Sequence, residues 1–287
     1  SRSLVFDLTP VRSPELAMER IAIYGKGGVG KSVVATSLSA CYARAGHRVL
    51  HVGCDPKHDS AVRLVDGKGS IPTVLDVLAD DPNVTSTDRI LHEGRYGIQC
   101  CEAGGPEPGV GCGGRGVART LEFLEEMNVL DPDRYDTVLF DVLGDVVCGG
   151  FAAPLRQGFA RKVIIVVSEE PMALFAANNI SKAIHVYQPN GLALAGFVAS
   201  LKSPDADRAM IERFAATLST RVLAFIPRDP LILAAERERR TVVEFAPESA
   251  SALAFVRLSE TVLGIDPDAV PLPTPLSDDA FFEFIRS

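Results

Sequence analysis

Residues 21–32 are Ile21-Ala-Ile-Tyr-Gly25-Lys-Gly-Gly-Val-Gly-Lys31-Ser32, an apolar run followed by a segment rich in glycine and lysine. From Gly25 to Ser32 it fits the pattern G-x-x-x-x-G-K-[ST], and the apolar run before it is predicted to be a buried strand. A helical pattern follows over residues 32–45. A phosphate-binding P-loop needs this position between strand and helix, so a glycine-rich turn without a ligand is the weaker interpretation.

Each position of this loop has a predicted role in nucleotide binding. Backbone N–H groups of the glycines can surround phosphates, and the helix N-terminus adds its dipole. Lys31 supplies positive charge, and the Ser32 hydroxyl can ligate Mg²⁺. We expect the nucleotide contacts of the loop to be Gly25, Lys26, Gly27, Gly28, Val29, Gly30, Lys31 and Ser32.

Lys26 is a second cation, which the phosphate cradle does not require. We expect it to reach the nucleotide of a neighbouring subunit, which would make hydrolysis depend on dimerisation. A solvated loop lysine is the simpler alternative.

Short β-rich runs alternate with helical patterns along the whole chain. Apolar strands joined by helices are typical of a mostly parallel sheet covered on both faces, so we predict an α/β fold of the P-loop NTPase class with about seven or eight strands in a twisted sheet. The expected strands are 21–24, 48–52, 97–101, 137–140, 163–167, 194–199 and 222–226. The expected helices are 32–45, 72–79, 116–128, 172–186, 205–218, 230–239 and 249–263.

One domain over residues 21–265 is expected, because no linker rich in Pro, Gly or Ser divides the chain. Residues 1–20 are polar without an apolar h-region, so we predict a flexible extension rather than a secretory signal. Residues 266–287 are predicted to be an extended tail that ends in a short helix, which Ser277 could cap.

The composition narrows the class of protein. The 287 residues are 47% hydrophobic with a formal charge of −8, which argues against a general nucleic-acid binder. No apolar run approaches about 18 residues, so no transmembrane helix is expected. We predict a cytoplasmic protein that binds neither nucleic acid nor membrane. Its six cysteines are then expected to be thiols, metal ligands or redox groups rather than disulfides.

Aspartates follow two of the expected strands. Asp55 and Asp59 follow the second strand, and Asp141 and Asp145 follow the fourth. Polar groups at the carboxyl ends of parallel strands meet at one edge, so these acids are predicted to orient water or hold the shell of Mg²⁺. Aspartate is also an ordinary turn residue. Asp141 and Gly144 match a phosphate-sensing switch, in which the acid faces Mg²⁺ and the glycine N–H contacts the γ-phosphate.

Two cysteines lie in glycine-rich stretches that we expect to be loops, Cys112 within 104–116 and Cys148 within 147–150. Two thiols are half the ligands of a four-thiolate site for zinc or a [4Fe–4S] cluster. Cys100 and Cys101 alternate across a predicted strand and cannot both face one metal. The simplest completion is a two-fold dimer, in which each chain gives Cys112 and Cys148 to one shared cluster. A disulfide between these two is the competing interpretation.

Asp141 and Cys148 are close in sequence, with Asp145 between them. A shift of the loop at the phosphate is therefore expected to move the thiolate end. Asp145 could polarise the attacking water or a water on Mg²⁺.

Four motifs together resemble those of the iron proteins of nitrogenase and its relatives, the dark-operative protochlorophyllide and chlorophyllide reductases and the methylthio-alkane reductases. They are GKGGVGKS, GCDPKHDS, GGPEPGVGCGGRG and FDVLGDVVCGGFA, and the resemblance extends from Ile21 to about Val262. It implies a homodimer with one [4Fe–4S] cluster between its subunits. Such a dimer passes electrons, with MgATP hydrolysis, to a larger metalloprotein, and ferredoxin or flavodoxin is the implied electron source.

By position, the resemblance implies roles for single residues. ATP contacts are implied at Lys26, acting across the dimer, and at Gly28, Gly30, Lys31 and Ser32. Hydrolysis and switch roles are implied at Asp55, Asp59, Asp141 and Asp145, and cluster ligation at Cys112 and Cys148. Arg115 matches a docking-surface arginine that is ADP-ribosylated in some nitrogenase iron proteins. The segment around the adenine is matched by Pro227, Arg228, Asp229 and Glu236.

Different residues indicate different branches within this family. Residues 104–111, 115–117 and 176–181 are similar to the nitrogenase branch. The departures from it are Val33, Val34, His58, Gly113, Ser200 and Leu233, together with a short C-terminus. They leave the ATP and cluster chemistry intact, and we expect a nitrogenase-like reductase of the methylthio-alkane type. The alternatives are nitrogenase itself or a (proto)chlorophyllide reductase.

Other classes of protein share the two-lysine P-loop. A partition or division-site ATPase would need a basic surface or tail, whereas the last residues contain Asp278, Asp279 and Glu283 against Arg286. A small-molecule kinase or amide ligase would leave Cys112 and Cys148 without a role.

Overall fold

The computed structural model describes residues 18–67, 70–106, 112–144, 150, 152–156 and 158–287, and its centre is an eight-stranded sheet. The strand order is β3-β4-β2-β5-β1-β6-β7-β8, and all neighbours are parallel except β3 and β4. The strands are β1 (Glu19–Tyr24), β2 (Val49–Cys54), β3 (His92–Glu93), β4 (Gln99–Glu102), β5 (Thr137–Val142), β6 (Lys162–Val167), β7 (Ala193–Ser200) and β8 (Val222–Ile226). This confirms the predicted fold class.

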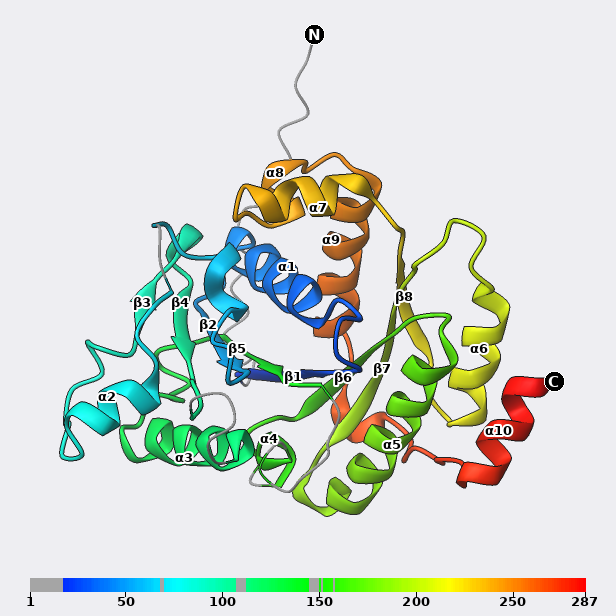
Figure 1. Ribbon diagram of the computed structural model, residues 1–287, viewed down its shortest axis with the longest axis horizontal. Helices are drawn as coiled ribbons and strands as arrows, with labels where there is room; N and C mark the ends of the chain where they lie inside the picture. Colours follow the sequence, from blue (N-terminus) through cyan, green and yellow to red (C-terminus); the bar gives the residue numbers. More distant parts are fainter. Residues whose placement is uncertain (1–17, 68–69, 107–111, 145–149, 151, 157) are drawn as a thin grey trace, which may run out of the picture.

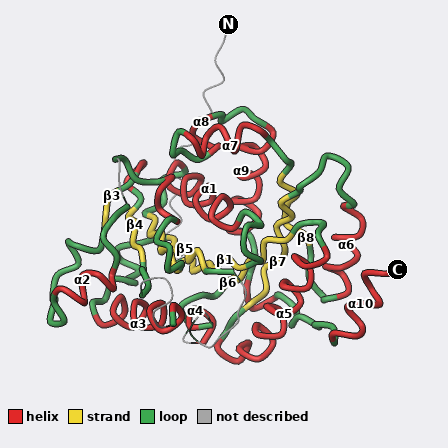
Figure 2. Tube along the Cα trace, in the orientation of Figure 1, coloured by secondary structure: helices red, strands yellow, loops and turns green. Residues whose placement is uncertain are grey.

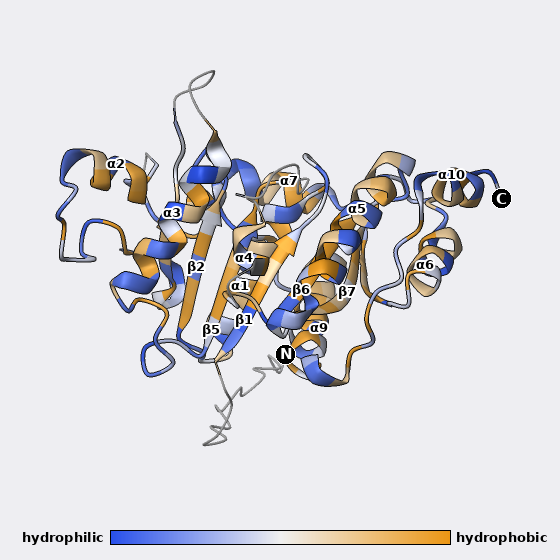
Figure 3. Ribbon diagram, turned by 90° about the horizontal axis from the view of Figure 1, so that it is seen from below, coloured by the Kyte–Doolittle hydropathy of each residue, from blue (hydrophilic) through white to orange (hydrophobic). Residues whose placement is uncertain are grey.

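Helices cover both faces of the sheet, as Figures 1 and 2 show. On one face lie α1 (Lys31–Arg44), α7 (Pro230–Arg237), α8 (Val242–Phe245) and α9 (Ala250–Leu263). On the other lie α2 (Val74–Asp80), α3 (Gly113–Glu126), α4 (Ala153–Arg156), α5 (Pro171–Tyr187), α6 (Arg208–Thr217) and α10 (Asp278–Arg286). Every residue of β2, β5 and β6 is buried, because both faces of these central strands are covered. Figure 3 shows these apolar strands between the helices.

Several boundaries differ from those expected. β1 begins at Glu19, two residues before the expected start. The short elements β3, α4 and α8 were not predicted, since two to four residues give no periodic pattern. The described residues contain no helix long and apolar enough to span a membrane.

The expectation that residues 104–116 form only a loop was wrong for their last part. Helix α3 begins at Gly113, so Gly113, Gly114 and Gly116 belong to its first turns. Close packing explains the glycines: a Cβ atom at Gly116 would lie 2.5 Å from a methyl carbon of Leu75. The glycines therefore allow the helix to approach its neighbours rather than preventing a helix.

The C-terminal tail is fastened to the body of the protein. Asn178 on α5 donates to the Leu276 carbonyl at 2.9 Å and accepts from the Leu276 N–H at 2.8 Å. Beyond it, Ser277 caps α10 by accepting from the Ala280 N–H. Phe281 is fully buried and makes an edge contact with Phe175, at a centroid distance of 5.1 Å. Helix α10 therefore covers part of α5 and α6 (Figure 1).

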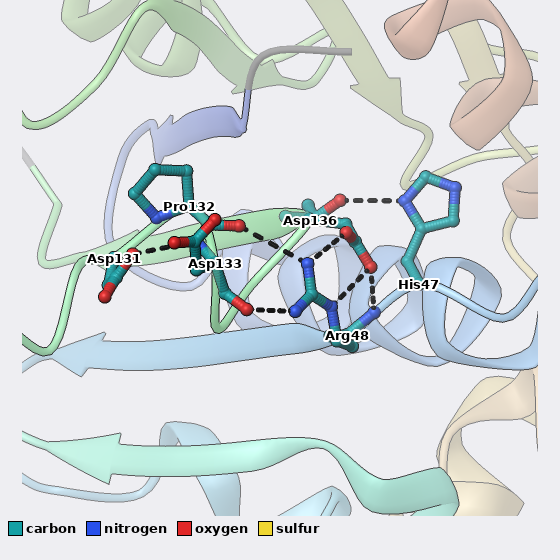
Figure 4. A network of polar contacts seen from close by, with 7 residues as sticks. His47, Arg48, Asp131, Pro132, Asp133 and Asp136 are labelled. Atoms are coloured by element: carbon teal, nitrogen blue, oxygen red, sulfur yellow. Dashed lines mark hydrogen bonds and ion pairs between the residues drawn. The ribbon is translucent and has the colours of Figure 1, made fainter. Parts of the chain in front are cut away.

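A polar network ties the starts of β2 and β5 together at the amino ends of the strands (Figure 4). The Arg48 guanidinium donates to both carboxylate oxygens of Asp136, at 3.1 and 2.7 Å, and to the carbonyls of Pro132 and Asp133. Both charged side chains are more than two-fifths exposed, so the ion pair itself contributes at most about 1 kcal/mol. Its main effect is to fix the register of two strands whose opposite ends form the site.

Candidate functional site

The P-loop has the backbone that its glycines predict. Gly25, Gly28 and Gly30 have φ of 141°, 76° and 109°, a region that favours glycine. A Cβ atom at Gly25 would also lie 2.3 Å from the Val166 carbonyl oxygen. The loop thus turns sharply between β1 and α1, and its residues Gly27, Gly28 and Gly30 line a cavity of about 280 Å³.

Predicted residues of the nucleotide loop, the aspartate set and the adenine segment line this cavity. They include Gly27, Gly28, Gly30, Lys31, Ser32, Asp55, Asp59, Asp141 and Glu236. Lys31 is 8% exposed and its ammonium donates to the Lys26 carbonyl at 3.1 Å, which holds the charge over the loop. Gly25 and Val29 are buried beneath the loop. Lys26 is partly exposed, and its action across a dimer stays a prediction.

Asp141 lies at the carboxyl end of β5 with its carboxylate almost completely buried. Burial raises its pKa, whereas hydrogen bonds from the hydroxyls of Ser60 and Ser32 and the charge of Lys31 lower it. The Ser60 hydroxyl donates to Asp141 Oδ2 at 2.5 Å. A carboxylate beside the Ser32 hydroxyl is the hard-oxygen environment that Mg²⁺ prefers.

Asp55 and Asp59 add two acids to the same cavity. Asp55 accepts from the Lys57 N–H at 2.9 Å. Its pKa is raised chiefly by burial, and the charges of Asp59 and Asp141 raise it further. Several carboxylates around one cavity repel one another, and a divalent cation would relieve that repulsion. The residues present therefore fit Mg²⁺ together with a nucleotide.

An ion pair, which the sequence did not predict, closes another side of the cavity. Arg63, on the 3₁₀ turn η1 (Ser60–Arg63), pairs with Glu236 on α7, and both line the cavity. Nothing in the sequence joins these two residues, which are 173 positions apart. The only signal was a cation that follows the Asp55–Ser60 motif.

The predicted adenine segment is divided between two places. Glu236 lines the cavity, but Pro227, Arg228 and Asp229 do not, within the part of the chain that the structure describes. Asp229 caps α7 by accepting from the Leu231 N–H, and its other oxygen accepts from Ser251 at 2.6 Å. Arg228 donates to the Lys202 carbonyl at 2.8 Å. Their part in adenine binding stays a prediction.

Gly144 lies beside the P-loop. A Cβ atom there would lie 3.6 Å from the Gly27 nitrogen and 3.9 Å from the Gly25 oxygen. The switch glycine therefore lies where a phosphate held by the P-loop would be within reach. Asp145 and Cys148 lie outside the described residues.

Cys112 is exposed and forms the N-cap position of the 14-residue helix α3. A helix N-terminus stabilises a thiolate, and exposure leaves the sulfur accessible to a second chain. A Cβ atom at Gly150 would lie 2.2 Å from the carbonyl carbon of Gly114, so Gly150, two residues after Cys148, lies against this helix. Arg115, in the same helical turn, is exposed beside it.

The remaining cysteines are buried. Burial raises the pKa of Cys41 to about 12 and raises the pKa of Cys54, Cys100 and Cys101 as well, which makes these thiols poor ligands. Cys100 and Cys101 belong to the cores on opposite faces of the sheet. Among the described residues, no group of three or more His, Cys, Asp or Glu is placed to hold a metal ion. An exposed Cys112, two residues before the Gly114 that Gly150 contacts, fits a cluster completed by a second subunit.

A second connection joins the two sites. A Cβ atom at Gly105 would lie 2.4 Å from Pro56 Cβ, so Gly105, shortly after β4, packs against the residue after Asp55. A Cβ atom at Gly116 would also lie 3.6 Å from the Gly104 carbonyl oxygen, so the first turns of α3 are linked to the Asp55 loop through Gly104 and Gly105.

Comparisons with known proteins agree with this geometry. Residues 19–287 match the profile of the family described as "4Fe-4S iron sulfur cluster binding proteins, NifH/frxC family". The chain is 41% identical over 266 residues to a nitrogenase iron protein of Methanospirillum hungatei, covering 91% of this chain and 93% of that protein. It is 43% identical over 271 residues to nitrogenase iron protein 2 of Methanothermobacter thermautotrophicus, covering 94% and 98%.

Solved structures of similar fold include proteins of other functions. The septum site-determining protein MinD of Pyrococcus horikoshii, complexed with Mg-ADP, has a TM-score of 0.68 and 26% identity, covering 85% of this chain and 96% of that one. Cobyrinic acid a,c-diamide synthase of Mycobacterium smegmatis has a TM-score of 0.63 at 22% identity, covering 91% and 100%, and shows the fold alone.

The fold is therefore shared with proteins of several functions and does not assign the family. The family profile and the sequence relatives do assign it. They confirm the cofactors predicted from the P-loop and the two glycine-flanked cysteines. The chain belongs to the NifH/frxC family of 4Fe-4S iron sulfur cluster binding proteins, and its cofactors are a [4Fe–4S] cluster, ATP and Mg²⁺.

Proposed function

We propose that this chain is the iron protein of a nitrogenase-like reductase. Two chains form a homodimer that holds one [4Fe–4S] cluster and passes electrons, with MgATP hydrolysis, to a larger catalytic metalloprotein. The observation that carries this proposal is the pair of short connections between the nucleotide cavity and the Cys112 end. One is marked at its two ends, where Gly144 lies beside Gly27 and Gly150 beside Gly114. The other passes through Pro56 and Gly105 to Gly104, whose carbonyl oxygen would lie 3.6 Å from a Cβ at Gly116.

The residues of the cavity have different roles in nucleotide binding and hydrolysis. Lys31 and the loop N–H groups bind the phosphates, and Ser32 and Asp141 hold Mg²⁺. Asp55 and Asp59, with Asp145 in the proposed set, orient the attacking water. Lys26 extends to the nucleotide of the partner subunit, so that hydrolysis requires the dimer.

Cys112 and Cys148 would hold the cluster, which supplies a one-electron carrier when bound. The chain's own contribution is mechanical. The N–H of Gly144 reports the γ-phosphate, and a shift of this segment changes the contact of Gly150 with the first turn of α3. Nucleotide state thereby sets the positions of the thiolates.

Arg115 marks the face on which the catalytic component docks. It is exposed in the first turn of α3, three residues after Cys112. A partner that covers Cys112 would therefore also meet this guanidinium. Ferredoxin or flavodoxin is the proposed electron source for the same face.

Within the family, the methylthio-alkane type is our first choice. It rests on the departures at Val33, His58, Ser200 and Leu233 from the residues usual in nitrogenase. Ser200 Oγ lies 3.1 Å from the position of a Cβ at Gly30, next to the loop, and Leu233 is 52% exposed. The identity of 41% and 43% with nitrogenase iron proteins favours nitrogenase as the second candidate. A (proto)chlorophyllide reductase is the third.

Cross-complementation decides among them. The purified dimer, MgATP and a chemical reductant are combined with the catalytic components of methylthio-alkane reductase, nitrogenase and chlorophyllide reductase in turn. Product formed only with the first component supports the proposal, and product formed only with another reassigns the branch. Failure with all three, together with salt-sensitive binding to DNA or liposomes, would instead favour a partition-type switch.

A further inference from the structure

Polar side chains from four elements form a continuous hydrogen-bonded chain behind the nucleotide cavity. They are Ser39 on α1, His51 on β2, Ser60 on η1 and Asp141 on β5. Ser39, His51 and Ser60 are fully buried, and Asp141 is 3% exposed. Water therefore does not replace any of these bonds.

The three contacts are short and consecutive. Ser39 Oγ lies 2.9 Å from His51 Nδ1, and His51 Nε2 lies 2.8 Å from Ser60 Oγ. Ser60 Oγ then lies 2.5 Å from Asp141 Oδ2. Both ring nitrogens of His51 are thus engaged, one on each side.

The donor and the acceptor of each hydrogen bond follow from the ionisation state of Asp141. Asp141 must be ionised to hold Mg²⁺, and an ionised carboxylate only accepts. Ser60 therefore donates its single proton to Asp141, and its oxygen must accept from His51 Nε2–H. His51 Nδ1 is then unprotonated, and it accepts from the Ser39 hydroxyl. All three donors are directed at the carboxylate, and such aligned bonds strengthen one another.

The imidazole is neutral in this setting. Burial, together with the charge of Arg63, lowers the pKa of His51 to about 3. A neutral imidazole has one donor and one acceptor, which is what this chain requires. Without the Nε2–H, the buried Ser60 oxygen would lose its donor and its hydroxyl could rotate away from Asp141.

We propose that His51 is a positioning residue of the nucleotide site, which acts through Ser60 to hold the Asp141 carboxylate oriented for the Mg²⁺–nucleotide complex. Ser39 completes the chain and links helix α1, which begins at the P-loop lysine, to the same acid. The inference rests on nucleotide and Mg²⁺ binding and not on electron donation, so either can fail without the other.

The tautomer of His51 in the unsubstituted protein tests the direction of the hydrogen bonds. Histidine nitrogens are observed by ¹⁵N NMR in the cluster-loaded dimer, and the His51 signal is identified by its loss in His51→Gln. The expected result is the neutral Nε2–H tautomer in the dimer with MgADP bound. The Nδ1–H tautomer would overturn the proposal, since Nε2 would then take the Ser60 proton that Asp141 needs; an imidazolium would overturn it as well, since Ser39 could not then donate to Nδ1.

The affinity for MgADP tests whether His51 affects the nucleotide site. Removal of one buried donor is expected to weaken MgADP binding by about 3- to 10-fold in His51→Leu. Binding of ADP without Mg²⁺ should change by less than about twofold, because the chain acts on the metal-binding acid. His51→Gln keeps an N–H near Nε2 and should restore most of the affinity.

The matched variants separate positioning from packing. Ser39→Ala removes the most distant bond and should have a smaller effect than His51→Leu. Calorimetric titration of the full dimer measures all four proteins, and thermal unfolding checks that they fold. Equal losses in the Leu and Gln variants, or equal losses with and without Mg²⁺, would show a merely structural role and contradict the proposal.

Discussion

The backbone of Gly150 is in direct contact with that of Gly114: a Cβ atom at Gly150 would lie 2.2 Å from the Gly114 carbonyl carbon and oxygen. Gly150 is two residues after Cys148, and Gly114 is two residues after Cys112. Any side chain at this contact would therefore push the two proposed cluster-binding segments apart.

Gly150→Ala is expected to reduce cluster loading while the sheet remains folded. Overpacking at this contact costs about 1–3 kcal/mol, and the strain falls on the cysteine segments. Iron content after anaerobic reconstitution measures the effect. Gly264→Ala is the matched control, since a Cβ there would lie 3.6 Å from its nearest neighbour. Equal iron in both variants would show that the contact does not position the ligands.

Gly144→Ala tests the switch at the other end of the same segment. A Cβ at Gly144 would lie at ordinary contact distance from Gly27, so the fold should tolerate it. The methyl group would nevertheless occupy space beside the phosphate loop. We expect the cluster to stay bound while MgATP no longer drives electron delivery, and the same for Asp145→Ala. Electron transfer with normal ATP dependence in these variants would remove the coupling role from this loop.

The ion pair between Arg63 and Glu236 gives a prediction for nucleotide affinity. In Arg63→Ala the Glu236 carboxylate loses its partner and repels the phosphates, which we expect to weaken ATP binding by roughly fivefold, or about 1 kcal/mol. Arg63→Lys keeps the charge and should lose less. Competition titrations with a fluorescent nucleotide measure both. Unchanged affinity in Arg63→Ala would show that the pair only joins η1 to α7.

The strands and the P-loop could be predicted from the sequence because both depend on local order. Apolar runs mark buried parallel strands, and the spacing of Gly25, Lys31 and Ser32 sets the loop. Pairings between distant segments gave no such signal. The Arg63–Glu236 pair, the Ser39–His51 bond and the start of α3 at Gly113 each depend on what another segment places nearby. Sequence spacing alone does not contain that information.

Glu102 gives a pH prediction with a definite sign. It is 1% exposed on β4, and burial raises its pKa from 4.5 to about 8. Between these values the folded protein holds a proton that the unfolded chain releases. The contribution of Glu102 to the free energy of unfolding therefore falls as pH rises from 4.5 to about 8 and is constant above that.

Glu102→Gln should therefore flatten the fall in stability over this window, because an amide does not titrate. The amide keeps an oxygen to accept from the Ala61 N–H, as Glu102 Oε1 does at 2.6 Å. Urea unfolding of both proteins at several pH values gives the difference. Parallel curves for the two proteins would mean that Glu102 is not the group that titrates.

Iron and subunit stoichiometry test the shared cluster most directly. Four thiolates from two chains predict a brown dimer with about four irons per two chains after anaerobic purification. Cys112→Ala and Cys148→Ala should each abolish loading, whereas Cys41→Ala, in the core, should load normally. An iron-free protein after reconstitution, or a Cys148→Ala dimer with a full cluster, would contradict a cluster held by Cys112 and Cys148 of two subunits.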